Sequence, residues 1–132
     1  MKRILLAYDG TPAADTAMST TVALAKALKA EVGVVSVVPV HPGRTPVDPW
    51  DDRPVHTEQL ERARRLLREY GIEPVLIEPA GDPAMMIEEE AERGGYDTIV
   101  IGSRRLGAVG RLLQGSVSEH VATHAKTTVV IA

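Results

Sequence analysis

Five short aliphatic runs alternate with four stretches of helical pattern along this chain, and this alternation restricts the fold. The runs cover residues 3–8, 31–38, 72–79, 96–102 and 127–132. The helical patterns cover residues 11–28, 57–71, 81–95 and 116–125. The first run, RILLAY, is typical of a strand buried on both faces. Strands and helices in this order form a parallel sheet covered by helices on both faces. We therefore expect an α/β fold with an open five-stranded parallel sheet.

The length and composition narrow the class of protein. A chain of 132 residues is long enough for one core and too short for two, so residues 1–132 are expected to form a single domain. The net charge of -3 argues against broad nucleic-acid binding. The sequence has no cysteine, which excludes disulfides and thiol catalysis. No apolar run has the length of a signal or membrane segment, so we expect a cytoplasmic protein.

Residues 39–54 interrupt the regular alternation. This stretch, PVHPGRTPVDPWDDRP, contains five of the nine prolines of the chain. Proline removes a backbone donor and disfavours helix interiors and central strands. We therefore predict an extended loop over residues 39–54, which leaves the sheet at its carboxyl edge.

The carboxyl edge of the predicted sheet is where a ligand is expected. In open α/β sheets, ligands bind beyond the carboxyl ends of the strands, where the strand order reverses. This rule selects Asp9 after the first strand, Val37 and Val38 at the end of the second, and Gly102 after the fourth. Asp9 has an alternative interpretation as a turn residue ahead of the first helix.

The stretch that follows Gly102 reads GSRRLGAVGRLLQGSVSE and combines glycines with hydroxyl side chains. Within it, GRLLQGS has the spacing of a P-loop, but Ser116 stands where the lysine should be. Gly115 and Ser116 instead open a helix, whose unpaired amides and dipole favour an anion. The segment from Ser116 to Glu119 is equally a capping box, which needs no ligand. Both interpretations remain open.

Two segments resemble the universal stress protein family, and the resemblance covers nearly the whole chain. They are ILLAYDGT near the start and YDTIVIGSRRLGAVGRLLQGSVSEHVATHA near the end. The nucleotide-binding branch of that family carries Gly, two residues, Gly, nine residues, then Gly followed by Ser or Thr. Gly102, Gly115 and Ser116 match this motif, whereas Arg105 stands at its second glycine. An arginine there either crowds the phosphates or supplies a guanidinium partner for them.

The resemblance implies a fold and a ligand. The fold is that of the adenine nucleotide alpha hydrolases, with strand order 3-2-1-4-5. The ligand is ATP or another adenine nucleotide, accompanied by magnesium rather than by a separate metal site. The adenine would lie against Ala7, Tyr8 and Val37, with Asp9 near the nucleoside or its metal. The residues that would meet the phosphates are Gly102, Ser103, Arg104, Gly115, Ser116, Val117 and Ser118.

The resemblance also implies an assembly and a role. Family members commonly pair through their final strands, so a homodimer through residues 127–132 is expected, together with an unidentified protein partner. The first functional hypothesis is a regulatory module of the stress response that binds ATP. The alternative is a protein-interaction module of the same fold that has lost the nucleotide, motivated by Arg105. A third hypothesis is a slow ATPase with Asp9 as its base. A binding protein is favoured over an enzyme.

The remaining side chains have structural interpretations. The arginines between residues 62 and 68 are expected to pair with glutamates on their own helix. Met85 and Met86 are expected to fill the core. His120 and His124 are four residues apart, but no third metal ligand is evident. Trp50 is expected either to cap the site or to pack within its loop.

Overall fold

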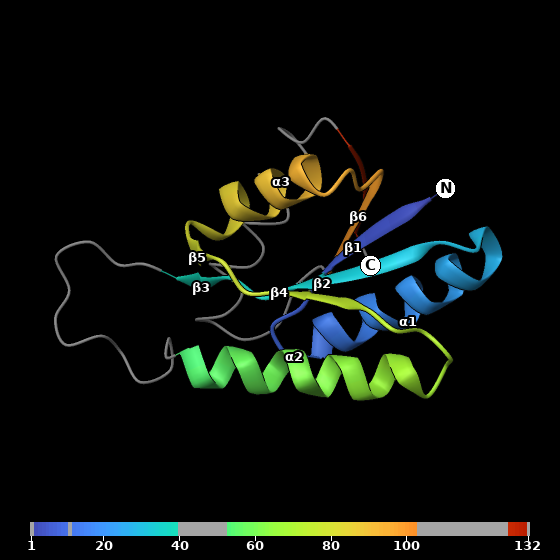
Figure 1. Cartoon of the computed structure of the whole chain (residues 1–132), viewed down its shortest axis with the longest axis horizontal. Coiled ribbons are helices and arrows are strands. Elements are labelled where there is room, and N and C mark those ends of the chain that lie inside the picture. Colours follow the sequence, from blue (N-terminus) through green and yellow to red (C-terminus); the bar gives the residue numbers. More distant parts are fainter. Residues whose placement is uncertain (1, 11, 40–52, 103–126, 132) are drawn as a thin grey trace, which may run out of the picture.

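The computed structural model contains one parallel five-stranded sheet, and it describes residues 2–10, 12–39, 53–102 and 127–131 (Figure 1). The strands are β1 (Arg3–Ala7), β2 (Glu31–Val35), β4 (Val75–Ile77), β6 (Thr98–Ile101) and β7 (Thr128–Ile131). Their order across the sheet is β4-β2-β1-β6-β7, and every neighbouring pair is parallel. Counted along the chain, this is the order 3-2-1-4-5. The predicted fold class and strand order are therefore confirmed.

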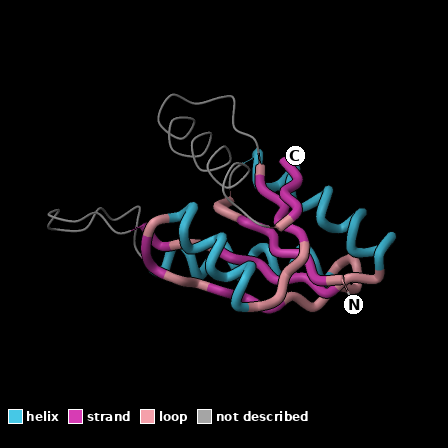
Figure 2. Tube along the Cα trace, turned by 90° about the horizontal axis from the view of Figure 1, so that it is seen from above, coloured by secondary structure: helices cyan, strands magenta, loops and turns pink. Residues whose placement is uncertain are grey.

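The described helices cover both faces of this sheet. They are α1 (Pro12–Leu28), α2 (Arg53–Arg68) and α3 (Pro83–Arg93). In Figure 1, α1 and α2 lie below the sheet and α3 lies above it. Figure 2 shows the molecule from above and marks both termini. The chain ends just after β7, which is an edge strand of the sheet.

Each face of the sheet has its own apolar cluster, because successive residues of a strand point to opposite sides. Leu6, Tyr8 and Val34 pack with α1 and α2 in the first cluster. Leu5 and Val35 pack with α3 in the second. The central strands are thus buried on both faces, as the continuous aliphatic runs predict.

A second, two-stranded sheet was not expected from the sequence. It consists of β3 (Val38–Pro39) and β5 (Ala80–Gly81), which pair in parallel. The amide of Val38 also donates to the carbonyl of Pro79, at 2.8 Å. The predicted strand 31–38 is therefore split in two, and the predicted strand 72–79 is shortened to β4. Two-residue strands are too short to carry a period in the sequence, which explains why they were missed.

The prediction of an extended loop over residues 39–54 is wrong at both ends. Pro39 belongs to β3, and α2 begins at Arg53. Proline is well tolerated in the first turn of a helix, because the amide that it lacks has no partner there. Pro54 therefore does not prevent α2 from starting early. Residues 40–52 lie outside the described part of the chain, and so does Trp50.

The ends of α2 and α3 follow their sequence signals. The side chain of Asp82 caps α3 by accepting a hydrogen bond from the amide of Met85, at 3.1 Å. After α2, Gly71 adopts a φ of 77°, and the amide of Ile72 donates to the carbonyl of Leu67. This is the hydrogen-bond pattern with which a left-handed glycine ends a helix. The expected roles of Asp82 as a helix cap and of Gly71 as a helix stop are thus confirmed. The helix α2 itself ends at Arg68.

Candidate functional site

The carboxyl ends of β1, β2 and β6 meet at one edge of the sheet, because β1 lies between the other two strands. This edge carries Asp9 just beyond β1, Val37 just beyond β2 and Gly102 just beyond β6. In the register of the sheet, Ala7 is the partner of Val35, two residues before Val37. The fold therefore brings together the described part of the site that the sequence predicts. It consists of Ala7, Tyr8, Asp9, Val37 and Gly102.

The side chains of this group point to two different faces. Ala7 and Val37 are half-buried and pack against the cluster on the α3 side. Tyr8 belongs to the cluster on the α1 and α2 side, and only 2% of its surface is exposed. Because of this alternation, Ala7 and Val37 can form one apolar floor at the edge, whereas the ring of Tyr8 lies on the other side of the sheet.

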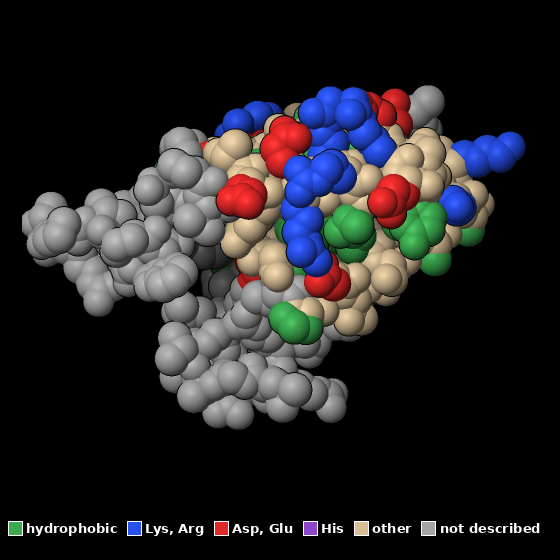
Figure 3. Space-filling view, turned by 90° about the horizontal axis from the view of Figure 1, so that it is seen from below, with side chains coloured by type: hydrophobic (Ala, Val, Ile, Leu, Met, Phe, Trp, Pro, Cys, Tyr) green, Lys and Arg blue, Asp and Glu red, His purple; other side chains and the backbone are tan. Residues whose placement is uncertain are grey.

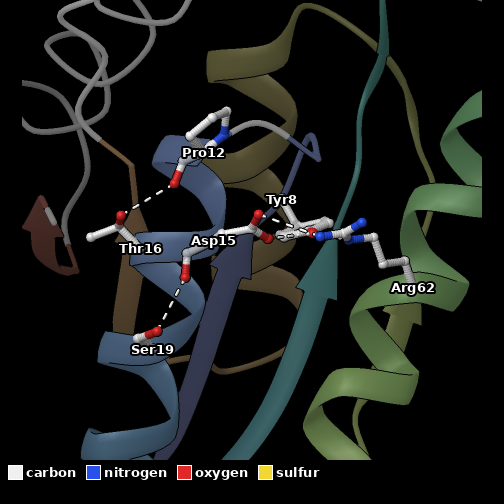
Figure 4. A network of polar contacts seen from close by, with 6 residues as sticks. All are labelled: Tyr8, Pro12, Asp15, Thr16, Ser19 and Arg62. Carbon is white, nitrogen blue, oxygen red and sulfur yellow. Dashed lines mark hydrogen bonds and ion pairs between the residues drawn. The ribbon is translucent and has the colours of Figure 1, made fainter.

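The phenol of Tyr8 is held by two charged side chains (Figure 4). Its hydroxyl donates to Oδ1 of Asp15 in the first turn of α1, at 2.7 Å. It accepts a hydrogen bond from Nε of Arg62 on α2, at 3.2 Å. Arg62 also lies 3.5 Å from Oδ2 of Asp15. Burial and the hydrogen bond to Asp15 raise the pKa of Tyr8 to about 12, so the hydroxyl keeps its proton and acts as a donor.

Gly102 is a glycine because of its packing. It is buried, and a Cβ atom at this position would lie 2.5 Å from the carbonyl oxygen of Ala13 and 2.7 Å from its carbonyl carbon. Real Cβ atoms essentially never come that close to a backbone atom. The end of β6 thus rests directly on the first turn of α1. This contact explains the first glycine of the motif without any ligand.

A polar contact at the same edge escaped the sequence analysis. Ser36, which is buried just beyond β2, donates to Oε1 of Gln59 on α2, at 3.3 Å. The Gln59 side chain also lies against Gly10, where an added Cβ atom would be 3.4 Å from its Cγ. Gln59 therefore connects the ends of β1 and β2 with α2. A serine at the end of an otherwise apolar strand was the one signal in the sequence that could have indicated this contact.

The remaining predicted site residues lie outside the described part of the chain. They are Ser103, Arg104, Gly115, Ser116, Val117 and Ser118, together with Arg105, His120 and His124. Within the residues that the structure describes, no group of three or more histidine or acidic side chains has the arrangement of a metal site. Among the same residues, no helix has the length and apolar character needed to cross a membrane.

Two expectations about side chains outside the candidate site need correction. The arginines of α2 do not pair mainly within their own helix: Arg62 pairs with Asp15 and Arg68 with Glu73, whereas Arg64 does reach Glu61. Asp15 and Glu73 come within reach only because the fold brings α1 and the turn after α2 next to this helix. Figure 3 shows acidic side chains beside a band of basic ones on this face.

The second correction concerns the core. Met85 does not fill it, because 54% of its surface is exposed. Met86 is half-buried and lies beside Gly81, where an added Cβ atom would be 3.0 Å from its Cγ. Only one of the two methionines therefore packs against the body of the protein.

The sequence model of the universal stress protein family matches residues 1–132. This match spans the whole chain. The chain belongs to the universal stress protein family. A universal stress protein from Thermus aquaticus is 36% identical over 139 residues, which cover 98% of this chain and 97% of the relative. The crystal structure of a family protein from Burkholderia pseudomallei is similar with a TM-score of 0.77 at 26% identity, covering 99% of this chain and 95% of that one.

Other members of the universal stress protein family have been solved with adenine nucleotides. One carries cAMP. It is similar with a TM-score of 0.77 at 19% identity, and the match covers 99% of this chain and 96% of that one. A member from Arabidopsis thaliana carries AMP. It is similar with a TM-score of 0.73 at 21% identity, and the match covers 99% of this chain and 90% of that one. At these identities the likeness to this chain extends to the fold alone. Nucleotide binding is thus a property of some universal stress proteins.

Proposed function

We propose that this universal stress protein is a small regulatory module of the stress response that binds an adenine nucleotide, ATP with magnesium, at the carboxyl edge of its sheet. One observation carries the proposal. The ends of β1, β2 and β6 converge there, with an apolar floor from Ala7 and Val37, and Gly102 marks the point where the chain leaves β6. The adenine complexes of relatives with the same fold support it.

In this proposal the site has a base end and a phosphate end. The adenine ring packs on Ala7 and Val37, and Tyr8 contributes only its main chain because its ring lies on the opposite face. The phosphates meet the candidate phosphate loop, which we define as residues 102–118. Its contacting residues are Gly102, Ser103, Arg104, Gly115, Ser116, Val117 and Ser118.

Magnesium fits the donor set at this edge only in company with the nucleotide. Magnesium prefers oxygen ligands and commonly binds through one or two carboxylates together with substrate phosphates. Asp9 supplies one half-buried carboxylate beyond β1, and no set of three candidate ligands exists among the described residues. The carboxylate of Asp9 would therefore hold magnesium that phosphate oxygens also bind, and the cation would neutralise phosphate charge.

Calorimetric titration of the purified protein with AMP, and with ATP in the presence and absence of magnesium, tests the proposal. We expect binding of both nucleotides and tighter binding of ATP with magnesium. The Asp9→Asn variant should lose the magnesium increment while it keeps its affinity for AMP. An absence of heat at millimolar nucleotide for both ligands would refute the proposed function.

A second function of the same fold is favoured by one feature of the sequence. Arg105 occupies the second glycine position of the nucleotide motif, and a large side chain there crowds the phosphates. In that case the protein acts only through contacts with other proteins. The Arg105→Gly variant separates the two functions. If the wild type does not bind ATP and the variant does, the interaction module is supported. If the wild type binds ATP and the variant does not, Arg105 is a partner of the phosphates.

The proposed module is a homodimer that pairs through β7. This strand forms an edge of the sheet and leaves Ile131 45% exposed, and an uncovered apolar edge strand favours pairing with another chain. Light scattering after size-exclusion chromatography should give the mass of a dimer. The Ile131→Lys variant should shift the protein to a monomer. Leu28→Lys, at a side chain of similar exposure on α1, is the matched control and should leave the dimer intact.

A further inference from the structure

The Tyr8 side chain connects three elements of the fold. Its buried hydroxyl, at the end of β1, donates to Asp15 in the first turn of α1 and accepts from Arg62 on α2. Arg62 and Asp15 also approach each other directly. We call these three side chains the Tyr8 network (Figure 4). Hydrogen bonds to charged groups are stronger than neutral ones, so the network holds the first turn of α1 at a fixed place relative to β1 and α2.

The same turn of α1 supports the beginning of the candidate phosphate loop. Gly102 lies so close to the backbone of Ala13 that even a Cβ atom would not fit between them. Ala13 is two residues from Asp15, within the same turn. Because the contact is between two backbones, Gly102 cannot keep its place if this turn moves. The position of Gly102 therefore depends on the position of Asp15.

We propose that the Tyr8 network is a positioning device for the nucleotide site: it fixes the first turn of α1, and that turn sets the place of Gly102. Tyr8 is a positioning residue in this scheme, since its hydroxyl lies on the face of the sheet opposite Ala7 and Val37. The inference rests on the proposed function for its ligand. The positioning of Gly102 itself is a property of the free protein.

The first test compares two buried tyrosines in the free protein. Tyr8→Phe keeps the ring and removes the hydroxyl that joins the network. Tyr96→Phe removes the hydroxyl of another buried tyrosine, which lies beside Gly33 on β2. In nitrogen-proton correlation spectra, Tyr8→Phe should shift the amide signal of Gly102 and speed its hydrogen exchange, whereas Tyr96→Phe should change neither. An unchanged Gly102 signal in Tyr8→Phe overturns the inference.

The second test measures AMP affinity by calorimetry in the same variants. A binding arrangement that is populated one-tenth of the time lowers the affinity about tenfold, and a loss of about this size is expected for Tyr8→Phe but not for Tyr96→Phe. Equal affinity of Tyr8→Phe and the wild type would overturn the role of the network in binding. If the wild type binds no AMP, the proposed function fails, and the Gly102 signal alone decides whether the network positions Gly102.

A pair of variants at Asp15 separates the hydrogen bond from the charge. Asp15→Asn and Asp15→Ala both remove a negative charge from the N-terminus of α1, with equal loss of the favourable interaction with the helix dipole. Only Asn keeps a carbonyl oxygen that can accept from the Tyr8 hydroxyl. We expect Asp15→Asn to keep the Gly102 signal and Asp15→Ala to reproduce Tyr8→Phe. Identical spectra of the two variants would contradict the inference. Asp15 is only half-buried, so this pair leaves the core untouched.

Discussion

Replacing Gly102 with alanine distinguishes the two reasons for a glycine at the start of the candidate phosphate loop. A new Cβ atom would lie 2.5 Å from the oxygen and 2.7 Å from the carbon of the Ala13 carbonyl group, where ordinary contact begins at 3.4 Å. Both atoms belong to the backbone of α1 and cannot turn away. If the glycine serves packing, Gly102→Ala must therefore destabilise the protein even when no nucleotide is present.

The expected cost follows from the nature of this clash. Adding a methyl group to a well-packed interior costs about 1–3 kcal/mol, and a contact with immovable backbone belongs at the upper end of that range. For a domain of this size, a loss of about 3 kcal/mol lowers the melting temperature by about 10 °C. Thermal unfolding of the free protein, followed by circular dichroism, measures this shift directly.

Gly71→Ala is the matched control for Gly102→Ala. An added Cβ atom at Gly71 meets no atom within 4 Å, but φ is +77° there. Its cost is therefore backbone strain alone, about 1 kcal/mol. A melting temperature of Gly102→Ala equal to that of the wild type would refute the packing explanation, and the glycine would then have to be explained by the ligand.

Three further predictions concern stability. Gly33→Ala should cost about 1–3 kcal/mol in urea unfolding, because the new Cβ atom would lie 2.2 Å from the Tyr96 hydroxyl and the buried ring would have to move. A wild-type unfolding midpoint in this variant would contradict the packing described here. Asp82→Ala removes the side chain that caps α3 and should lower the free energy of unfolding by about 1 kcal/mol. Asp82→Asn keeps the acceptor and should lower it less. Equal losses of stability in the two variants would argue against the cap. The pKa of Tyr8 is raised from 10.0 to about 12, so the folded protein holds this proton more tightly than the unfolded chain does. Its contribution to stability is complete below pH 10 and is lost as the pH rises towards about 12. Over that range, the free energy of unfolding should fall more steeply in the wild type than in Tyr8→Phe, and parallel curves would refute this account.

The sheet was predictable from the sequence because its signals are local. Each central strand is a continuous aliphatic run, and each described helix carries a cap or a stop signal at one end, such as Asp82 or Gly71. The alternation of these elements implies parallel strands. The position of the candidate site follows from the same alternation, since it requires only the carboxyl ends of the strands. The convergence of Asp9, Val37 and Gly102 at one edge of the sheet was predicted in this way.

The contacts between elements were not predictable, because they depend on how helices lie against the sheet. Arg62 carries the same local pattern as the other arginines of α2, and only the packing of α2 beside α1 brings it to Tyr8 and Asp15. The approach of Gly102 to Ala13 likewise joins residues that are 89 positions apart in the sequence. The two short strands β3 and β5 pair with each other, and this pairing has no signature within either segment.

In the proposed site, the dipeptide Ala7–Tyr8 would combine two roles through the period of a strand. Successive side chains point to opposite faces, so Ala7 faces the side of α3 together with Val37, and Tyr8 faces α1 and α2. A residue proposed to contact a base and a residue proposed to position Gly102 can therefore be neighbours in sequence without sharing a surface. Shifting β1 by one residue would exchange the two faces. Ala7 would then face α1 and α2, and the Tyr8 ring would lie at the base end of the proposed site. The register of β1 against β2, with Ala7 opposite Val35, is thus as important for the proposed site as any single side chain in it.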